Sequence, residues 1–475
     1  MKIAPTIRTE IEKYLKQKGM SMTEFGHIIG LNVGTISGII TGNRSLSVNQ
    51  LDRITMGMNL PPDYFYERFV EECVEESPLN WRRVKPFVYR CVELGRLDCL
   101  QRAVSMFLDN PIYSPSLFGL AEDLFRKGYR DAAAYLYENA AESERKQHSE
   151  RLALCQYRLF SIRIGEDQAQ NLQATAVFEA FVERLDEIDQ LDALKDLANV
   201  YRSLRKWDKV DEIARKMRGK AEVQYSMKHQ QKNRKNREHE KVTRGPLFGY
   251  IAYADLLCAS VSEAQGDYQQ ALQYTYAYAN LDWVKETDED TLHWIKLFQD
   301  WADCNIYVNK LLSGDTSVLS DYIEYIAASK VDKEMVTKLL NVMFAANRFQ
   351  LDVNHVLERF ETLIDSFVKL GQPSSDMYTK QVIPEQLARF EYELAYYYLY
   401  RSMYNDGFKY LMYAMLKSHI INNETYFINC MGLFLHFQDY AAPETKTGFL
   451  KLIEKVWLKN VEKNVEKHGT ADRRS

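Results

Sequence analysis

Hydrophobic residues recur every three or four positions along most of this chain, and that spacing is typical of amphipathic helices. The first 66 residues divide into five short helices at capping residues. Ile7, Ile11 and Leu15 mark the first helix, which Gly19 ends as a left-handed cap residue would. We therefore expect an all-α protein that begins with a group of short helices.

Two of these short helices follow each other closely. A capping box from Ser21 to Glu24 starts a helix that stops at Gly30, and Asn32 then caps a helix that Gly42 closes. Two short helices joined by a tight turn form a helix-turn-helix, whose second helix lies in the major groove of DNA. Residues 1–66 are therefore a candidate DNA-binding domain, which we call the head.

Beyond residue 80 the pattern stays helical nearly to the end, and a local signature recurs in it. Most copies have an aromatic residue followed three residues later by a small or apolar residue, where one helix would turn into the next. The copies are Gly128–Ala132, Lys206–Val210, Gly266–Ala271 and Gly407–Leu411, with Gly95–Leu100 as a weaker one. From Leu97 in the weaker copy to Tyr129 in the next copy the distance is 32 residues. Tetratricopeptide repeats have a period of about 34 residues.

This signature predicts a right-handed, tetratricopeptide-like superhelix after the head. Such an array stacks paired helices and has a concave groove along its length. An irregular all-helical domain is the alternative interpretation of the same pattern.

The composition agrees with long helices and limits the function classes. The 475 residues include 21 glycines and 11 prolines, together about 7 % of the chain, where average usage is about 12 %. The net charge of −5 excludes a globally basic nucleic-acid coat, so any nucleic-acid surface must be local. The seven scattered cysteines never have Cys-x-x-Cys spacing, which argues against a disulfide framework and a zinc cluster.

The ends and charged segments complete the expected organisation. No run of 18 apolar residues and no apolar signal core occur, so we expect a soluble, cytoplasmic protein without membrane contact. The glutamate-rich residues 67–80 indicate a linker or a charged helix, 81–460 the repeat region, and 461–475 a polar tail. Residues 228–244 form a basic tract, which is either a solvated loop or a contact to DNA phosphates or an acidic partner.

The head resembles the DNA-binding domains of phage-repressor (XRE/Cro) type over about 60 residues. The matching motifs run from Ser21 to Gly26, Ile29 to Leu31, Thr35 to Ser37 and Gly42 to Arg44. The resemblance implies that Val33, Gly34, Ser37 and Gly38 face base edges, while Asn32, Thr35 and Arg44 approach phosphates.

The head departs from that family at positions that bear on base readout. Met22 stands where the family usually has a phosphate-binding glutamine, and two of the four base-facing positions are glycine. We therefore expect DNA shape and backbone contacts to matter more than usual. The net charge of residues 1–66 is only +2, so a head retained for dimerisation or protein contact is the alternative.

A repressor-like head followed by tetratricopeptide repeats resembles the RRNPP-type cytoplasmic peptide-pheromone receptors of Gram-positive bacteria. This group includes the Rgg, NprR, PlcR and PrgX types and is related to the phage arbitrium receptors. The resemblance implies a homodimeric transcription regulator that binds an inverted-repeat operator in double-stranded DNA. It also implies that a short linear signalling peptide binds in the repeat groove and alters DNA binding, as in quorum sensing.

In these receptors asparagines on the first helices of repeats hold the peptide backbone, because one carboxamide both donates and accepts hydrogen bonds. Asn199 fits that position best, and Asn341, in register with Phe349 as the repeat aromatic, is a second candidate. Arg202 lies one helical turn from Asn199 and can pair with a peptide carboxylate.

Enzymatic interpretations find little support. The nine histidines form no His-Glu-x-x-His pair, and the chain has neither a phosphate-binding P-loop motif nor a Gly-x-Ser-x-Gly elbow. We expect no enzyme activity, no metal and no cofactor. The competing hypothesis to a peptide-gated transcription factor is a repeat scaffold that binds a protein partner, with the head used for dimerisation or localisation.

Overall fold

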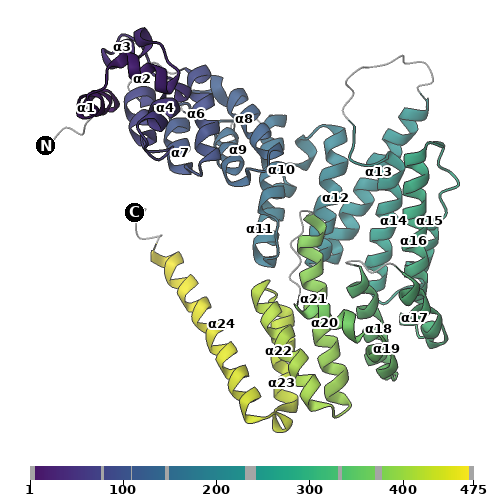
Figure 1. The fold of residues 1–475 in the computed structure, drawn as a ribbon. Coiled ribbons are helices and arrows are strands. Elements are labelled where there is room, and N and C mark those ends of the chain that lie inside the picture. The colour runs from purple at the N-terminus through teal and green to yellow at the C-terminus, as the bar shows by residue number, and fades with distance from the viewer. Residues whose placement is uncertain are drawn as a thin grey trace. The chain divides into compact units, whose positions relative to one another are not determined.

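The computed structural model describes residues 6–75, 80–108, 110–144, 149–230, 242–329, 334–369 and 377–469. Within these ranges the chain forms helices and turns without any β-strand, so the predicted all-α class is confirmed. The chain divides into two compact units, Met1–Ile162 and Arg163–Ser475, which we describe separately (Figure 1). No helix in the described ranges is long and apolar enough to cross a membrane.

Unit 1 begins with the head, and four of the five helices predicted for residues 1–66 lie within it, whereas the fifth begins at Tyr66 and extends to Phe69. Gly19, Gly30 and Gly42 end their segments as predicted, with φ values of +61°, +65° and +80°, and the left-handed conformation expected for Gly19 is confirmed. The capping box from Ser21 to Glu24 is formed. The helices are α1 (Ile7–Lys18), α2 (Met22–Ile29), α3 (Val33–Ile40), α4 (Val48–Gly57) and α5 (Tyr66–Phe69).

Helical hairpins follow the head in unit 1. Gly95 and Gly128 take positive φ values at the turns between α6 and α7 and between α8 and α9, and both hairpins pack closely. The elements are α6 (Trp81–Glu93), α7 (Leu97–Ser105), a 3-10 turn (Pro111–Tyr113), α8 (Ser114–Arg126), α9 (Arg130–Glu144) and α10 (Glu150–Arg163).

Part of the segment that we expected to be a linker is helical and attaches the head to the first hairpin. After α5, residues Val70–Glu75 continue as a π-helical segment, and 76–79 lie outside the described residues. Asp52 of α4 accepts hydrogen bonds from the Tyr66 hydroxyl (2.8 Å) and from Arg90 Nε of α6 (2.8 Å). The head and α6 thus share a polar contact between residues that are distant in sequence.

Unit 2 contains a longer series of paired helices. Neighbouring pairs such as α12 with α13, α14 with α15 and α21 with α22 make the most extensive contacts. The helices are α11 (Gln168–Glu179), α12 (Glu187–Ser203), α13 (Trp207–Gln230), α14 (Leu247–Ala264), α15 (Tyr268–Ala279), α16 (Glu289–Leu312), α17 (Leu319–Ala328), α18 (Met335–Phe349), α19 (Asn354–Arg359), α20 (Glu361–Lys369), α21 (Met377–Tyr400), α22 (Tyr404–Ile420), α23 (Glu424–Phe437) and α24 (Pro443–Gly469). Short 3-10 turns cover Val182–Arg184, Thr316–Val318 and Gln438–Tyr440.

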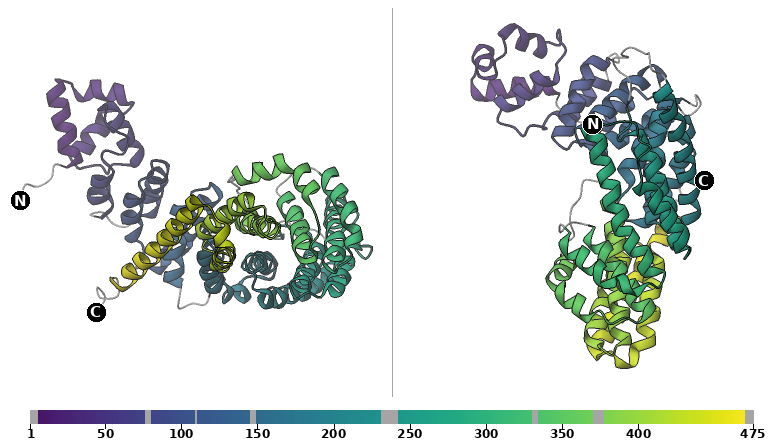
Figure 2. Two further views of the ribbon diagram at one scale, coloured as in Figure 1. Left: turned by 90° about the horizontal axis from the view of Figure 1, so that it is seen from below. Right: turned by 90° about the vertical axis from the view of Figure 1, so that its right-hand side faces the viewer.

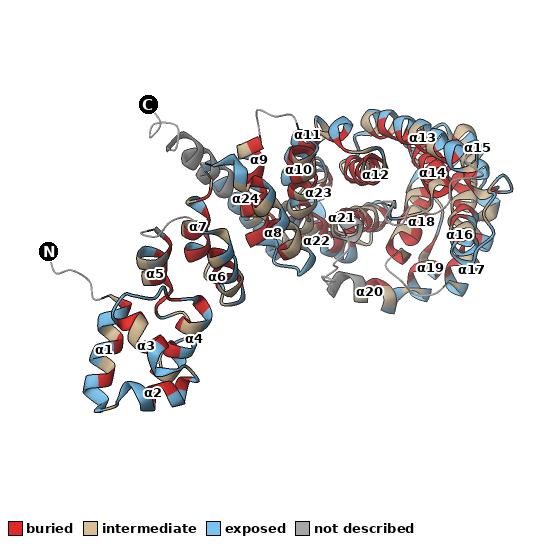
Figure 3. Ribbon diagram, turned by 90° about the horizontal axis from the view of Figure 1, so that it is seen from above, coloured by how far each residue is buried: buried red, intermediate tan, exposed pale blue. Residues whose placement is uncertain are grey.

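The helices of unit 2 follow a curve that brings distant segments together (Figure 2). α12 packs against α21, and buried residues lie where the helices face one another (Figure 3). At the turn before α23, the Ile421 carbonyl accepts a hydrogen bond of 2.8 Å from the backbone N–H of Gln168, and Asn422 donates to Asp167. Repeat type and handedness of this array stay predictions.

Two turns of unit 2 differ from the predicted positions. Gly407 lies inside α22, and the turn before it is made by residues around Ser402, whose φ is +62°. A Cβ at Gly407 would lie 2.6 Å from Leu399 Cγ, so close packing of α22 on α21 explains this glycine. Phe349 ends α18 instead of opening the next helix, so the expected repeat register of Asn341 is wrong.

The polar segments also have partial structure. Helix α24 continues through Gly469, so part of the expected tail 461–475 is helical, and residues 470–475 lie outside the described residues. Of the basic tract 228–244, residues 231–241 lie outside the described residues, but both flanks make ion pairs. Lys228 Nζ lies 2.7 Å from Glu286, and Arg244 Nη2 lies 2.6 Å from Asp196.

Candidate functional site

The turn between α2 and α3 is tight, and it depends on glycine at two positions, Gly26 and Gly30. Gly30 takes the left-handed conformation directly after α2, and α3 begins three residues later at Val33. A Cβ at Gly26 would lie 2.5 Å from the backbone oxygen of Leu31, so only glycine fits there. Asn32 then caps α3, because its side chain accepts a 2.7 Å hydrogen bond from the Thr35 N–H.

The predicted base-facing residues are on the accessible part of α3. Val33 is 41 % exposed and Gly34 is exposed, whereas Ser37 and Gly38, one turn further along, are half-buried. The opposite side of α3 carries Ile36, which is buried in the core of the head. An exposed helix start of this kind can enter a major groove, where glycines would allow the backbone to approach the bases.

The predicted phosphate contacts have different environments. Asn32 is exposed, whereas Thr35 is buried. The Thr35 hydroxyl accepts a hydrogen bond of 3.0 Å from Nη1 of the exposed Arg44. A Cβ at Gly38 would lie 3.1 Å from Arg44 Cβ, so this glycine lets the loop after α3 pack tightly. Thr35 therefore orients Arg44, whose exposed guanidinium can reach a phosphate.

The sequence analysis missed two further cations of this surface. Arg8 of α1 is exposed, and its Nη1 lies 2.6 Å from the place where a Cβ at Gly42 would be. Arg53 of α4 donates a hydrogen bond of 3.1 Å to the backbone oxygen of Gly30 in the α2–α3 turn. Both come from helices outside the motif, so no local spacing pointed to them.

At the start of α2, Met22 is 38 % exposed and supplies no side-chain donor. The capping box beside it places Glu24 at the helix N-terminus, where hydrogen bonds from the Ser21 backbone and hydroxyl lower the pKa of that carboxyl. The Glu24 carboxylate accepts a hydrogen bond at this end and adds negative charge there. The start of α2 therefore attracts an external anion less than an uncapped helix N-terminus would.

The comparison with known families agrees with this geometry. A family model described as Helix-turn-helix matches residues 11–65. No curated protein matches the chain. With the two caps, the glycine-closed turn and the exposed start of α3, this match defines the class of protein. The chain is a DNA-binding transcription regulator with an N-terminal helix-turn-helix domain.

The predicted peptide contacts lie on helices of unit 2 that pack on α21. Asn199 and Arg202 belong to α12, and Asn341 belongs to α18. Asn199 is 9 % exposed, and its carboxamide oxygen accepts a hydrogen bond from the Tyr253 hydroxyl of α14. Asn341 is half-buried and hydrogen-bonds with the Tyr322 hydroxyl. The carboxamide nitrogen of Asn199 keeps two donors that Tyr253 does not use.

Charged groups that the sequence analysis missed surround Arg202. Burial raises the pKa of Glu263 on α14 and of Glu385 on α21, against the attraction of Arg202, Arg205 and Arg389. Arg389 Nε donates to the Tyr426 hydroxyl at 3.0 Å. Glu393 of α21 also faces Arg389, and burial raises its pKa too. Because burial favours the neutral form of all three carboxyl groups, the three guanidinium groups here suit an acidic group.

Lys195, which is also on α12, lies among three aromatic rings. Lys195 Nζ lies 5.1 Å from the ring centre of Tyr253, 5.8 Å from that of Trp294 and 5.9 Å from that of Tyr250. Burial lowers the pKa of this ammonium. The cavity among these rings is only about 20 Å³, so the lysine fills its aromatic cage.

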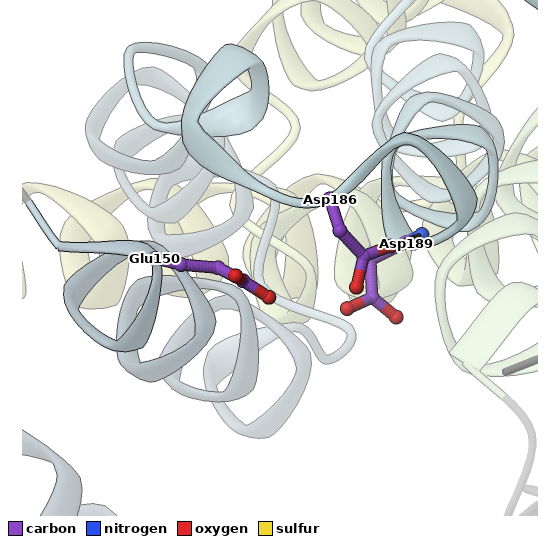
Figure 4. A group of neighbouring side chains, drawn as sticks. All are labelled: Glu150, Asp186 and Asp189. Atoms are coloured by element: carbon purple, nitrogen blue, oxygen red, sulfur yellow. Dashed lines mark hydrogen bonds between the residues drawn. The ribbon is translucent and has the colours of Figure 1, made fainter. Parts of the chain in front are cut away.

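The start of α12 is acidic for a structural reason. Asp186 caps the helix, because its carboxylate accepts hydrogen bonds from the backbone N–H groups of Ile188 (3.0 Å) and Asp189 (2.9 Å) (Figure 4). Asp189 adds a second carboxylate in the first turn, where the helix dipole favours negative charge. Glu150, also drawn, is in the first turn of α10 in unit 1.

Proposed function

We propose that a short linear peptide controls this helix-turn-helix regulator by binding to the helices of unit 2 and changing its DNA affinity. This proposal follows the resemblance to the RRNPP-type receptors. In it the chain acts as a homodimer on an inverted-repeat operator, because two-fold protein symmetry is mirrored in the order of half-sites. It acts by binding alone and has no catalytic role.

The observation that carries the proposal is the polar character of α12. A helix inside a packed array normally buries apolar side chains, because each buried polar group must find a hydrogen-bond partner. α12 instead has five buried polar side chains, which are Gln190, Asp192, Asp196, Asn199 and Ser203. Four of these groups already have partners in the protein: Gln190 donates to the Leu185 carbonyl, Asp192 and Asp196 pair with Arg244, and Ser203 donates to the Val200 carbonyl. The carboxamide nitrogen of Asn199 is the group of this set that can donate to a backbone C=O of an extended peptide.

The arginines next to Asn199 favour a peptide that carries a carboxylate. Arg202 follows Asn199 by one turn, and Arg205 is exposed and makes no ion pair with any described residue. The surrounding protein and the neighbouring Arg389 lower the pKa of Arg205, although solvent still reaches its side chain. A free C-terminal carboxylate or an acidic side chain of the peptide would offset this repulsion.

The peptide can change DNA binding only if it binds two arrangements of the chain with different affinities. Typical coupling free energies are about 1–3 kcal/mol, or about 5- to 150-fold in affinity. An effect of that size is measurable in a DNA-binding assay and needs no large rearrangement.

Two experiments test the proposal in sequence. Selection of DNA from a random duplex library by the full chain, followed by footprinting, should yield an inverted repeat. A single asymmetric half-site would contradict the dimer, and no selected DNA would favour the protein-scaffold alternative. A random-heptapeptide display library should then yield a binder that changes affinity for the selected DNA. Peptides that bind without any effect on DNA affinity would overturn peptide control.

A further inference from the structure

A groove on unit 2 lies apart from the residues proposed to contact the peptide. It is lined by residues of α13, of α15 and the turn after it, and by the buried Ile251 and Asp255 of α14, which form its floor. Helix α14 packs closely on both α13 and α15 (Figure 1). Its volume is about 790 Å³, within the range of about 300–1,000 Å³ typical of ligand pockets. None of the residues proposed to contact DNA or the peptide lines this groove.

The groove has an acidic floor and rim. Asp255 on the floor is 4 % exposed and forms an ion pair with Arg218 of α13. Arg218 Nε also donates to Glu222 at 2.8 Å, and Asp282 stands exposed on the opposite rim. The three carboxylates outnumber the one guanidinium, so the ionised lining has a net charge of −2.

The same groove has exposed aromatic faces. Tyr276 is 50 % exposed and Trp283 is 41 % exposed, and both line the groove. The Trp283 ring packs edge-on against Tyr225, with ring centres 5.5 Å apart, which holds the indole in place. Exposed aromatic faces attract cations, and the attraction is strongest for tryptophan.

From this juxtaposition of carboxylates and aromatic faces we propose that the groove binds an organic cation, a primary amine or polyamine with an aliphatic body. The ammonium group lies against Trp283 and Tyr276 and within reach of Asp282, and the aliphatic body contacts Ile251 on the floor. Burial raises the pKa of Asp255 to about 6 despite the nearby Arg218, so a second cation would favour its ionised form. This site goes beyond the proposed peptide function and does not depend on it.

An anionic ligand fits the groove poorly. A carboxylate or phosphate could pair with Arg218, but it would meet three carboxylates, two of which already bind that guanidinium. A neutral apolar ligand would leave the buried Asp255 in an even less polar environment. The charge balance therefore selects a cation.

Titration calorimetry of the full chain with spermidine at low ionic strength tests the site. Intrinsic tryptophan fluorescence, compared between parent and Trp283→Phe, reports whether the ligand reaches this rim. We expect saturable binding, with Trp283→Ala or Tyr276→Leu each weakening it about three- to fivefold, as a lost exposed cation–π contact would. Asp282→Asn should weaken it to a similar degree, while Asp131→Asn, an exposed charge change on α9, should have no effect.

A lysine tetrapeptide blocked at both ends is the second probe. If it binds more tightly than spermidine and responds to the same variants, the natural source of the cation is a side chain of a protein partner. Tighter spermidine binding identifies a free amine. The proposal is overturned if neither probe binds, or if binding is unchanged in variants whose melting temperatures match that of the parent.

Discussion

Arg44 donates a hydrogen bond from Nη1 to the hydroxyl of Thr35 across 3.0 Å, from the loop after α3 to the buried side of that helix. This contact links two of the three residues that were predicted to approach phosphates. It gives them different roles, because Thr35 is 4 % exposed whereas Arg44 is exposed. A positioned guanidinium loses less side-chain entropy when it binds an anion than a freely rotating one.

Replacing Arg44 by alanine should therefore weaken DNA binding for all sequences alike. The salt dependence, measured as the slope of log affinity against log salt, should fall by about one unit for one lost phosphate contact. Fluorescence anisotropy at several salt concentrations measures the slope. Arg126→Ala, on α8 and largely exposed, is the matched control and should leave the slope unchanged. A parental slope in Arg44→Ala would remove this residue from the interface.

Replacing Ser37 by alanine should change the preference at one base-pair position. Ser37 is the only one of the four predicted base-facing residues with a hydrogen-bonding side chain, the others being Val33, Gly34 and Gly38. A good direct contact discriminates by about 1–3 kcal/mol. Binding to a set of single-base operator variants measures this preference. An identical preference in parent and variant would mean that the head reads DNA shape without Ser37.

Two glycines of the head should respond in opposite ways to alanine. Gly26→Ala places a Cβ 2.5 Å from the Leu31 carbonyl, so the turn must open and the head should lose about 2 kcal/mol of stability. Gly34→Ala meets nothing closer than 3.6 Å and should stabilise α3 by about 0.5–1 kcal/mol. Thermal unfolding followed by circular dichroism compares the two. Equal stabilities of the Gly26→Ala and Gly34→Ala variants would mean that the α2–α3 turn has room for a Cβ at position 26.

Replacing Asn199 by alanine should weaken binding of a library-derived peptide about tenfold, as the loss of one amide contact would. DNA binding without peptide should stay near that of the parent. Tyr253→Phe is the control, because it removes the hydroxyl that binds Asn199 and should cost about 1 kcal/mol of stability with little effect on the peptide. If calorimetry finds parental affinity in Asn199→Ala, the peptide contacts must be sought on other helices of unit 2.

Glu391 should make the stability of unit 2 depend on pH. The side chain is fully buried in α21 beside Lys417 of α22, and burial raises its pKa to about 7. A carboxyl with a raised pKa stabilises the fold when protonated, so this contribution is present below the ordinary pKa of 4.5 and is lost as pH rises through 7. The loss between those limits is about 3 kcal/mol for a shift of this size.

Urea unfolding of the parent and of Glu391→Gln across this pH range tests the prediction. Glutamine cannot ionise, so the free energy of unfolding of the parent relative to the variant should fall as pH rises from about 4.5 to 7. A difference that is constant with pH would mean that Glu391 titrates as an ordinary exposed carboxyl.

Local features of the head were predictable from sequence because they depend on neighbouring residues. The cap at Asn32 and the box from Ser21 to Glu24 join groups three residues apart, and both hydrogen-bonding patterns are formed. The glycine ends at Gly19, Gly30 and Gly42 follow from φ values that side-chain-bearing residues disfavour. Periodicity then gave the helical class of the whole chain.

The sequence by itself thus determined the class of fold and the helix-turn-helix, since these depend on propensity, capping and spacing within one or two turns. Only the tertiary structure decided which partner each polar group has. Tyr253 takes the oxygen of Asn199, Arg90 reaches Asp52, and Leu399 explains Gly407 inside α22. These contacts join residues on different helices, and no local periodicity specifies them, because the packing of whole helices brings their side chains together.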